Sequence, residues 1–144
     1  MPESYCHIAT HIVFSTKDRY PFLTGSKRTE THLYIGGIIK NLQGHPIIIN
    51  GVEDHIHILC LLPKETSIAK FVQTIKSNSS KWFSQTHINK FAWQQGYAAF
   101  SVSKSSISEV ETYIKNQELH HKRISFVDEF KQYVEKHGFV YDDK

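Results

Sequence analysis

The sequence holds only two cysteines, Cys6 and Cys60, and they form no CxxC pair. A structural zinc site usually takes four ligands that include closely spaced cysteines, so this class of site is disfavoured. We interpret both as small core residues of a reduced, cytoplasmic protein. No apolar run reaches roughly 18 residues, which argues against a membrane-spanning helix. Residues 1–4 lack the basic and apolar regions of a signal peptide.

The sequence also lacks a strong bias of charge. The formal net charge is +3, with a sequence pI of about 8.8, and this mild excess permits a polyanionic partner without requiring one. Hydrophobic residues make up 40% and charged residues 22%, so we expect a packed core rather than disorder. The length fits one domain, which we place at residues 1–144. Ten histidines are many for such a chain and need an explanation.

Hydrophobic periodicity predicts the order of the secondary structure. We expect strands at 6–15, 46–50, 51–62 and 96–103, and helices at 27–43, 67–84, 106–121 and from 125 onwards. The pair Asn50-Gly51 predicts a hairpin, and Ser106 with Glu109 predicts a capping box at the start of the third helix. The order β-α-β-β-α-β, followed by two helices, predicts an α+β, ferredoxin-like (RRM-like) fold with an antiparallel sheet and helices on one face.

Two histidines in a hydrophobic run form the most informative pattern. His55 and His57 flank Ile56 in a strand that is apolar on both faces, as is typical of a covered central strand. Side chains alternate along a strand, so both imidazoles point the same way and could bind one divalent ion. The two rings could equally be bonded to backbone or solvent. Two ligands are too few for a metal site, so a third group must come from elsewhere.

A second pattern lies on the helix expected at 106–121. Tyr113, Gln117 and His121 recur every four residues and therefore share one face of that helix. Gln117 interrupts a stripe that is otherwise apolar at Val110 and Ile114. Such breaks of a local rule are expected at functional sites. The alternative is an amphipathic helix with an aromatic and polar edge.

Together, these motifs resemble those of the single-tyrosine HUH transposases of small bacterial insertion sequences. The resemblance includes His55-Ile56-His57 on a strand and Tyr-Ile-Lys-Asn-Gln-Glu-Leu-His-His from Tyr113 on a later helix. It covers nearly the whole chain, with further similar segments at 14–23, 51–59, 75–83, 93–103 and 125–130. A related, domesticated group, the tyrosine transposases associated with repeated extragenic palindromes, shares these motifs, and the sequence does not separate the two.

The resemblance implies a metal-dependent endonuclease and strand transferase that cleaves and rejoins single-stranded DNA. His55, His57 and Gln117 would hold Mg²⁺ or Mn²⁺, which polarises the scissile phosphate. Tyr113, carried on a C-terminal helix, would attack phosphorus, form a 5′-phosphotyrosine and release a 3′-OH. Because these ligands are neutral, we expect weak metal binding until a DNA phosphate adds charge.

The resemblance also implies partners. They are single-stranded DNA with subterminal hairpins and a second copy of the chain, in a homodimer whose tyrosine helix completes the partner's site. Basic residues that could contact phosphates, or be ordinary solvated charges, are Lys17, Arg19, Lys76, Lys81, Lys104, Lys115, Lys122 and Arg123. Trp93, Tyr97 and Phe100 could stack on bases or pack in the core.

Two other classes of function stay open from the sequence. A non-catalytic, ferredoxin-like nucleic-acid-binding module would explain the basic charge and the aromatic residues, but not the spacing of the histidines, tyrosine and glutamine. A small zinc-binding regulatory domain would explain the histidines, but the cysteine spacing does not support it. His120 and His121 match the motif of the family, and we expect them near the metal or the DNA without assigning a firm role.

Overall fold

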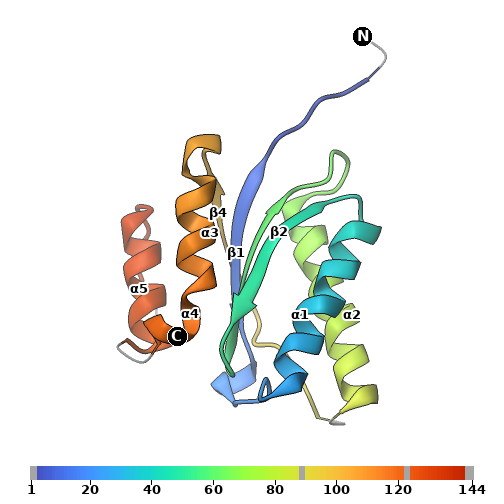
Figure 1. Ribbon diagram of the computed structural model, residues 1–144, viewed down its shortest axis with the longest axis vertical. Coiled ribbons are helices and arrows are strands. Elements are labelled where there is room, and N and C mark those ends of the chain that lie inside the picture. The colour runs from blue at the N-terminus through green and yellow to red at the C-terminus, as the bar shows by residue number, and fades with distance from the viewer. Residues whose placement is uncertain (1–2, 88–89, 122–123, 142–144) are drawn as a thin grey trace.

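The computed structural model describes residues 3–87, 90–121 and 124–141, and its centre is a four-stranded antiparallel sheet (Figure 1). The strands lie in the order β2-β3-β1-β4 and are β1 (Ala9–Ser15), β2 (His45–Gly51), β3 (His55–Leu61) and β4 (Ala98–Val102). Each neighbouring pair is antiparallel. This order is the one that the ferredoxin-like connection of strands and helices produces, so the predicted fold class is confirmed.

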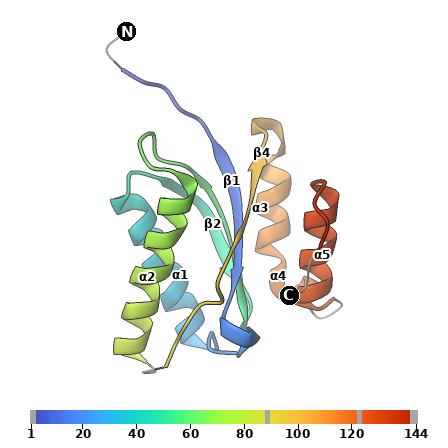
Figure 2. The same ribbon diagram turned by 180° about the vertical axis from the view of Figure 1, so that it is seen from behind.

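Helices cover both faces of the sheet (Figures 1 and 2). On one face lie α1 (Ser26–Asn41) and α2 (Ile68–Thr86), and on the other lie α3 (Ile107–Lys115), α4 (Gln117–His120) and α5 (Phe126–Lys136). Two short 3₁₀ helices are η1 (Lys17–Arg19) and η2 (Lys104–Ser106). No helix in the described part of the chain is both long and apolar enough to cross a membrane.

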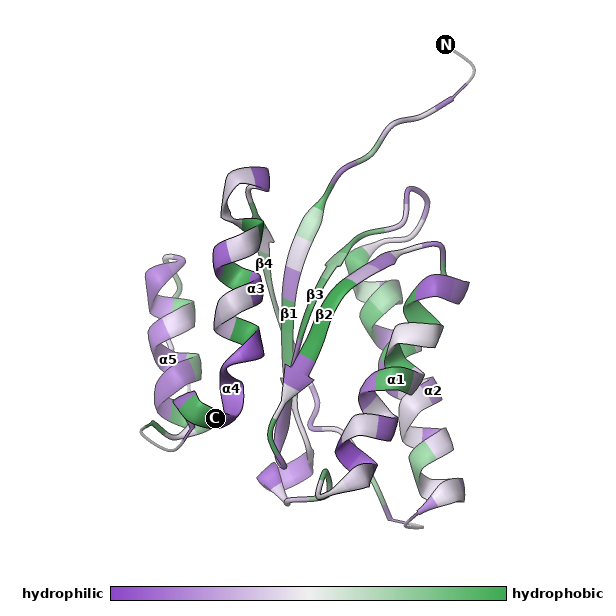
Figure 3. Cartoon of the chain, viewed as in Figure 1, coloured by the Kyte–Doolittle hydropathy of each residue, from purple (hydrophilic) through white to green (hydrophobic). Residues whose placement is uncertain are grey.

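The alternation of side chains along β1 explains the two layers. Ile12 and Phe14 belong to the large core under α1 and α2, whereas Val13 belongs to a smaller cluster with Phe100 and residues of α5. In Figure 3 the strands are largely hydrophobic, whereas α4 and much of α5 are hydrophilic. The second helical layer therefore covers the sheet with more polar side chains, and buried polar groups gather between the two.

The predicted hairpin between β2 and β3 is present, but its turn lies at residues 52–54, because Asn50 and Gly51 still belong to β2. Gly51 is essential to the shape of the hairpin. A Cβ atom at this position would collide with the carbonyl oxygen of His55, which is the first residue of β3. Only glycine allows this close approach of the two strands. The end of β2 therefore fixes the backbone at the point where the first histidine of the motif begins.

The start and the continuity of the third predicted helix differ from expectation. The hydroxyl of Ser106 accepts a hydrogen bond from Ser103 at 3.0 Å instead of capping the helix, because η2 precedes α3. The helix predicted at 106–121 is broken at Asn116 into α3 and α4. The amide of Asn50 on β2 donates to the carbonyl oxygens of residues 114 and 115, at 2.9 and 3.2 Å, which end α3. Ser125 does cap α5, since its hydroxyl accepts a bond from the backbone of Asp128.

Candidate metal centre and its tyrosine

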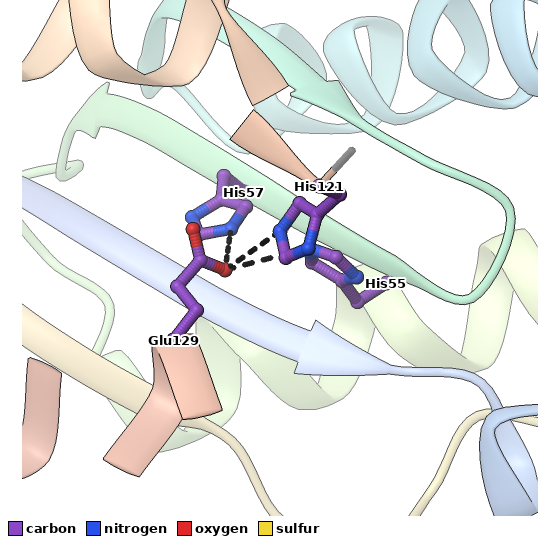
Figure 4. A group of neighbouring side chains, drawn as sticks. All are labelled: His55, His57, His121 and Glu129. Atoms are coloured by element: carbon purple, nitrogen blue, oxygen red, sulfur yellow. Dashed lines mark hydrogen bonds and ion pairs between the residues drawn. The ribbon is translucent and has the colours of Figure 1, made fainter. Parts of the chain in front are cut away.

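Four side chains meet on the face of the sheet that α3, α4 and α5 cover (Figure 4). His55 and His57 come from β3 and are buried, His121 follows α4, and Glu129 comes from α5. One ligand atom from each lies within 4.8 Å of the others. Strand, helix end and helix thus bring together residues that are far apart in the sequence.

The orientation of His55 suits a metal ligand. Its Nδ1 lies 2.8 Å from the carboxylate of Asp54, so the tautomer that donates there keeps a lone pair on Nε2. This Nε2 faces two more acceptors, Gln117 Oε1 at 3.3 Å and Glu129 Oε1 at 3.6 Å. The amide of Gln117 is oriented by its NH₂ group, which donates to Glu129 Oε2 at 3.2 Å. Three acceptors that converge on one point fit a divalent cation.

The structure brings all three ligands predicted from the sequence into one cluster. His55, His57 and Gln117 are each at most 1% exposed. His121 joins them, with its Nε2 3.1 Å from Gln117 Oε1. The sequence analysis missed Glu129, although a carboxylate on the apolar face of an amphipathic helix is a signal of the same kind as Gln117. The ligand set that we expected to be neutral therefore lies beside a buried negative charge.

Glu129 is the electrostatic centre of the cluster. Its carboxylate is 3% exposed and lies 3.2 Å from His57 Nε2 and 3.1 Å from His121 Nε2. Burial raises the pKa of Glu129, but hydrogen bonds from His121, His57 and Tyr113 outweigh burial and hold it well below its usual range. The carboxylate is therefore ionised and acts only as an acceptor.

The predicted nucleophile lies at the edge of this cluster. The hydroxyl of Tyr113, on α3, donates a hydrogen bond to Glu129 Oε2, and its ring lies 5.9 Å from that of His57. Burial raises the pKa of Tyr113, and the bonded, charged Glu129 raises it further. A surface pocket of about 320 Å³ is lined by Tyr113, His120, Glu129 and Tyr133, among others. The hydroxyl is thus protonated, held in place and next to an opening.

A third histidine, His11 on the neighbouring strand β1, contacts His57 from the side. It is fully buried, with its Nε2 2.8 Å from His57 Nδ1 and its Nδ1 3.1 Å from the hydroxyl of Tyr133. Burial, followed by the neighbouring His57, lowers the pKa of His11 to about 3. Burial also lowers the pKa of His57 to about 4, against the opposing effect of Glu129. Both rings are therefore neutral near pH 7.

The candidate DNA-binding residues are dispersed. Lys115 lies at the end of α3, the tyrosine helix, and Lys104 lies in η2 just before that helix. Lys17 and Arg19 are exposed in η1. Lys81 and Lys76 lie on α2, across the sheet. Lys122 and Arg123 lie outside the described residues.

The side-chain environments separate some of these candidates from others. The ammonium of Lys76 donates to the carbonyl oxygens of Gln94 and Gly96, at 2.7 and 2.8 Å, which ties it to the segment before β4. Of the aromatic candidates, Trp93 and Phe100 are buried in the core and only Tyr97 is exposed. The ammonium of Lys76 is thus already bonded within the chain, and Tyr97 is the exposed aromatic candidate.

Comparison with known proteins connects this site to a family. The sequence matches the family described as "Transposase IS200 like" over residues 4–117, a span that includes the strand histidines, Tyr113 and Gln117. The chain belongs to the IS200-like transposase family. The transposases for insertion sequence element IS200 of Salmonella typhimurium and Salmonella typhi are each 30% identical to it over 118 residues, covering 74% of either chain.

Solved structures of other transposases share the fold. A putative transposase from Deinococcus radiodurans matches with a TM-score of 0.64 and 21% identity, over 81% of this chain and 96% of that one. A REP-associated tyrosine transposase bound to a REP hairpin matches with a TM-score of 0.64 and 12% identity, over 86% and 76%. The family match ends at residue 117, so His121 and Glu129 of this transposase lie beyond it.

Proposed function

We propose that this transposase cleaves and rejoins single-stranded DNA at insertion-sequence ends through a 5′-phosphotyrosine formed on Tyr113. The observation that carries the proposal is the carboxylate shared by the tyrosine and the histidines. Glu129 Oε2 accepts the bond from Tyr113, while Oε1 lies 3.2 Å from His57 Nε2 and 3.6 Å from His55 Nε2. A nucleophile and a set of metal ligands are therefore adjacent.

The residues that would hold Mg²⁺ or Mn²⁺ are His55 and His57 through Nε2 and Gln117 through Oε1, with His121 and Glu129 within reach. The ion, when bound, would supply Lewis-acid polarisation of the scissile phosphate. Asp54 keeps the ring of His55 in the required tautomer. Glu129 supplies a negative charge to the ligand set, which supports metal binding by the free protein.

Tyr113 provides the bond to DNA. Its oxygen would attack phosphorus while the bond from phosphorus to the 3′ oxygen breaks, and the departing oxygen takes a proton to become a 3′-OH. Tyr113 loses one proton and the 3′ oxygen gains one, so the step balances. Glu129 Oε2 accepts the hydrogen bond of the tyrosine hydroxyl but is a weak base, because its pKa is held well below its usual range. The phosphotyrosine keeps the energy of the broken diester, so attack by a 3′-OH rejoins the DNA without ATP.

The test is a covalent adduct on a denaturing gel. Labelled single-stranded DNA that carries an element end is incubated with the protein and Mn²⁺, and wild type should form an adduct that EDTA prevents. Tyr113→Phe should form none, whereas Tyr34→Phe, on α1 across the sheet, should match wild type. An adduct of normal yield with Tyr113→Phe would exclude this nucleophile. Binding of the DNA without any adduct would favour a non-catalytic binding module.

Two further parts of the proposal concern partners. The structural neighbour bound to a REP hairpin supports hairpin DNA as a substrate. Palindromes scattered through the host genome would favour the domesticated group over an autonomous element.

We also propose a homodimer. In the single chain, α3 and α4 contact strands of their own sheet, which places Tyr113 at its own histidines. Mixing Tyr113→Phe with His57→Ala protein tests this, since activity returns only if sites are shared between subunits.

A further inference from the structure

We propose that His11 is a positioning residue that sets which nitrogen of His57 carries the proton, and that it links the metal site to Tyr133 on α5. The inference rests on the proposed function, because it concerns the ion that the strand histidines would hold. It goes beyond that function in assigning a role to a histidine on a different strand and to a tyrosine that lies past the family match.

The geometry is a continuous chain of polar contacts through the interior. The Tyr133 hydroxyl lies 3.1 Å from His11 Nδ1, His11 Nε2 lies 2.8 Å from His57 Nδ1, and His57 Nε2 lies 3.2 Å from Glu129. His11 thus uses both ring nitrogens, one toward a metal ligand and one toward α5. An apolar side chain would fill the same buried space beside Phe100 without the cost of burying polar atoms, so packing alone does not account for a histidine.

In the metal-free protein, the direction of every hydrogen bond follows from Glu129. An ionised carboxylate only accepts, so His57 donates from Nε2 and keeps the lone pair on Nδ1. That lone pair accepts from the Nε2–H of His11, which in turn accepts at Nδ1 from the hydroxyl of Tyr133. Each neutral ring carries one proton, on Nε2.

A metal ion at His57 requires the opposite direction. Ligation uses the lone pair of Nε2, so the proton of His57 must sit on Nδ1 and be donated to His11 Nε2. His11 must then carry its own proton on Nδ1 and donate it to the oxygen of Tyr133, whose O–H turns toward the pocket that it lines. His57 loses its Nε2 proton at the Glu129 end of the chain, and one proton enters at the Tyr133 end. Each imidazole ring therefore still carries one proton. A side chain at position 11 therefore has to accept in one state and donate in the other, as imidazole can.

Metal affinity tests the assignment without reference to activity. His11→Phe removes the acceptor for the Nδ1 proton of His57, and it should weaken Mn²⁺ binding by about 10- to 100-fold in a titration followed by electron paramagnetic resonance. His11→Gln should recover most of the affinity, because an amide oxygen can accept that proton. Tyr133→Phe should weaken binding by a few fold. Phe100→Leu changes the packing beside His11 but none of these bonds, and it should bind as wild type does.

The ring tautomers supply an independent readout that a packing role would not change. Nitrogen-15 spectra of the imidazoles, taken with and without diamagnetic Zn²⁺, should show His11 and His57 moving from the Nε2–H to the Nδ1–H form. The inference is overturned if His11 keeps its Nε2–H form while His57 binds the ion, or if His11→Phe binds Mn²⁺ as wild type does. If His57→Ala also binds Mn²⁺ as wild type does, the proposed metal site fails together with it. Loss of affinity in His57→Ala but not in His11→Phe overturns the role of His11 alone.

Discussion

Two buried histidines should make the metal-free transposase lose stability as the pH falls below about 6.5. Burial lowers the pKa of His11 to about 3 and that of His57 to about 4, from an ordinary value of 6.5. In the unfolded chain both rings are in water and titrate near that ordinary value. Between the folded and the unfolded pKa values, the unfolded chain binds more protons than the folded chain. The free energy of unfolding therefore decreases as the pH is lowered. The stability is fully present above about pH 7 and is lost progressively toward pH 4.

The size of the effect follows from the two shifts. At about pH 5, roughly 1.5 units below the unfolded value, each histidine should cost about 2 kcal/mol, at roughly 1.4 kcal/mol per unit. Both residues are at most 1% exposed, so solvent screens little of this. Together they should remove about 4 kcal/mol, a large part of the 5–15 kcal/mol (roughly) that stabilises a typical domain. Glu129 adds to the loss at lower pH, because its depressed pKa gives stability that disappears below about 4.5.

Urea unfolding in EDTA, at about pH 7.5 and about pH 5, measures this loss directly. His11→Gln removes one of the two groups, so the difference in unfolding free energy between the two pH values should shrink by about 2 kcal/mol. His45→Gln removes an exposed histidine and controls for the loss of one imidazole. The reasoning is refuted if His11→Gln loses as much stability as wild type between the two pH values.

Three further predictions concern single side chains. Glu129→Gln should lower the pKa of Tyr113, read from tyrosinate absorbance, because the carboxylate raises it; an unchanged titration would contradict this. Gly51→Ala should cost about 1–3 kcal/mol in urea unfolding, because its Cβ collides with the next strand, whereas Gly37→Ala on α1 has free space and should not destabilise. Asn50→Ala should cost about 1–2 kcal/mol and speed amide exchange in α4, since two bonds to the end of α3 are lost.

Local sequence patterns were sufficient to predict the sheet and four residues of the candidate site, namely His55, His57, Tyr113 and Gln117. The alternation in β1 and β3 and the helical stripe of α2 are set by burial, and burial repeats with the period of each element. The same periods show that His55 and His57 share a face, and that Tyr113 and Gln117 do. The resemblance to a known family then related the two faces to each other, and the structure places them together.

The remaining members of the site depend on contacts that no local pattern contains. In the register of β1 and β3, Val13 lies directly opposite His57. His11 lies two residues before Val13 on the same face, and from this diagonal position it reaches His57. Glu129 reaches the cluster only when α5 docks on the sheet. Its place among Phe126, Phe130 and Tyr133 on one helical face was visible in the sequence, but its partners were not. The break at Asn116 was hidden for the same reason, since it is bonded from β2.

The position of Glu129 suggests how Tyr113 and the proposed metal ligands depend on each other. One oxygen of its carboxylate holds the hydroxyl of Tyr113, and the other lies against His57 and His121. Any positive charge that the ligands bind therefore acts on the group that raises the pKa of the tyrosine, and it should lower that pKa toward its ordinary value. The proposed nucleophile would then be held inactive until the proposed ligand set is filled. Because Glu129 lies on α5, beyond the family match, this expected coupling depends on a residue outside the matched span.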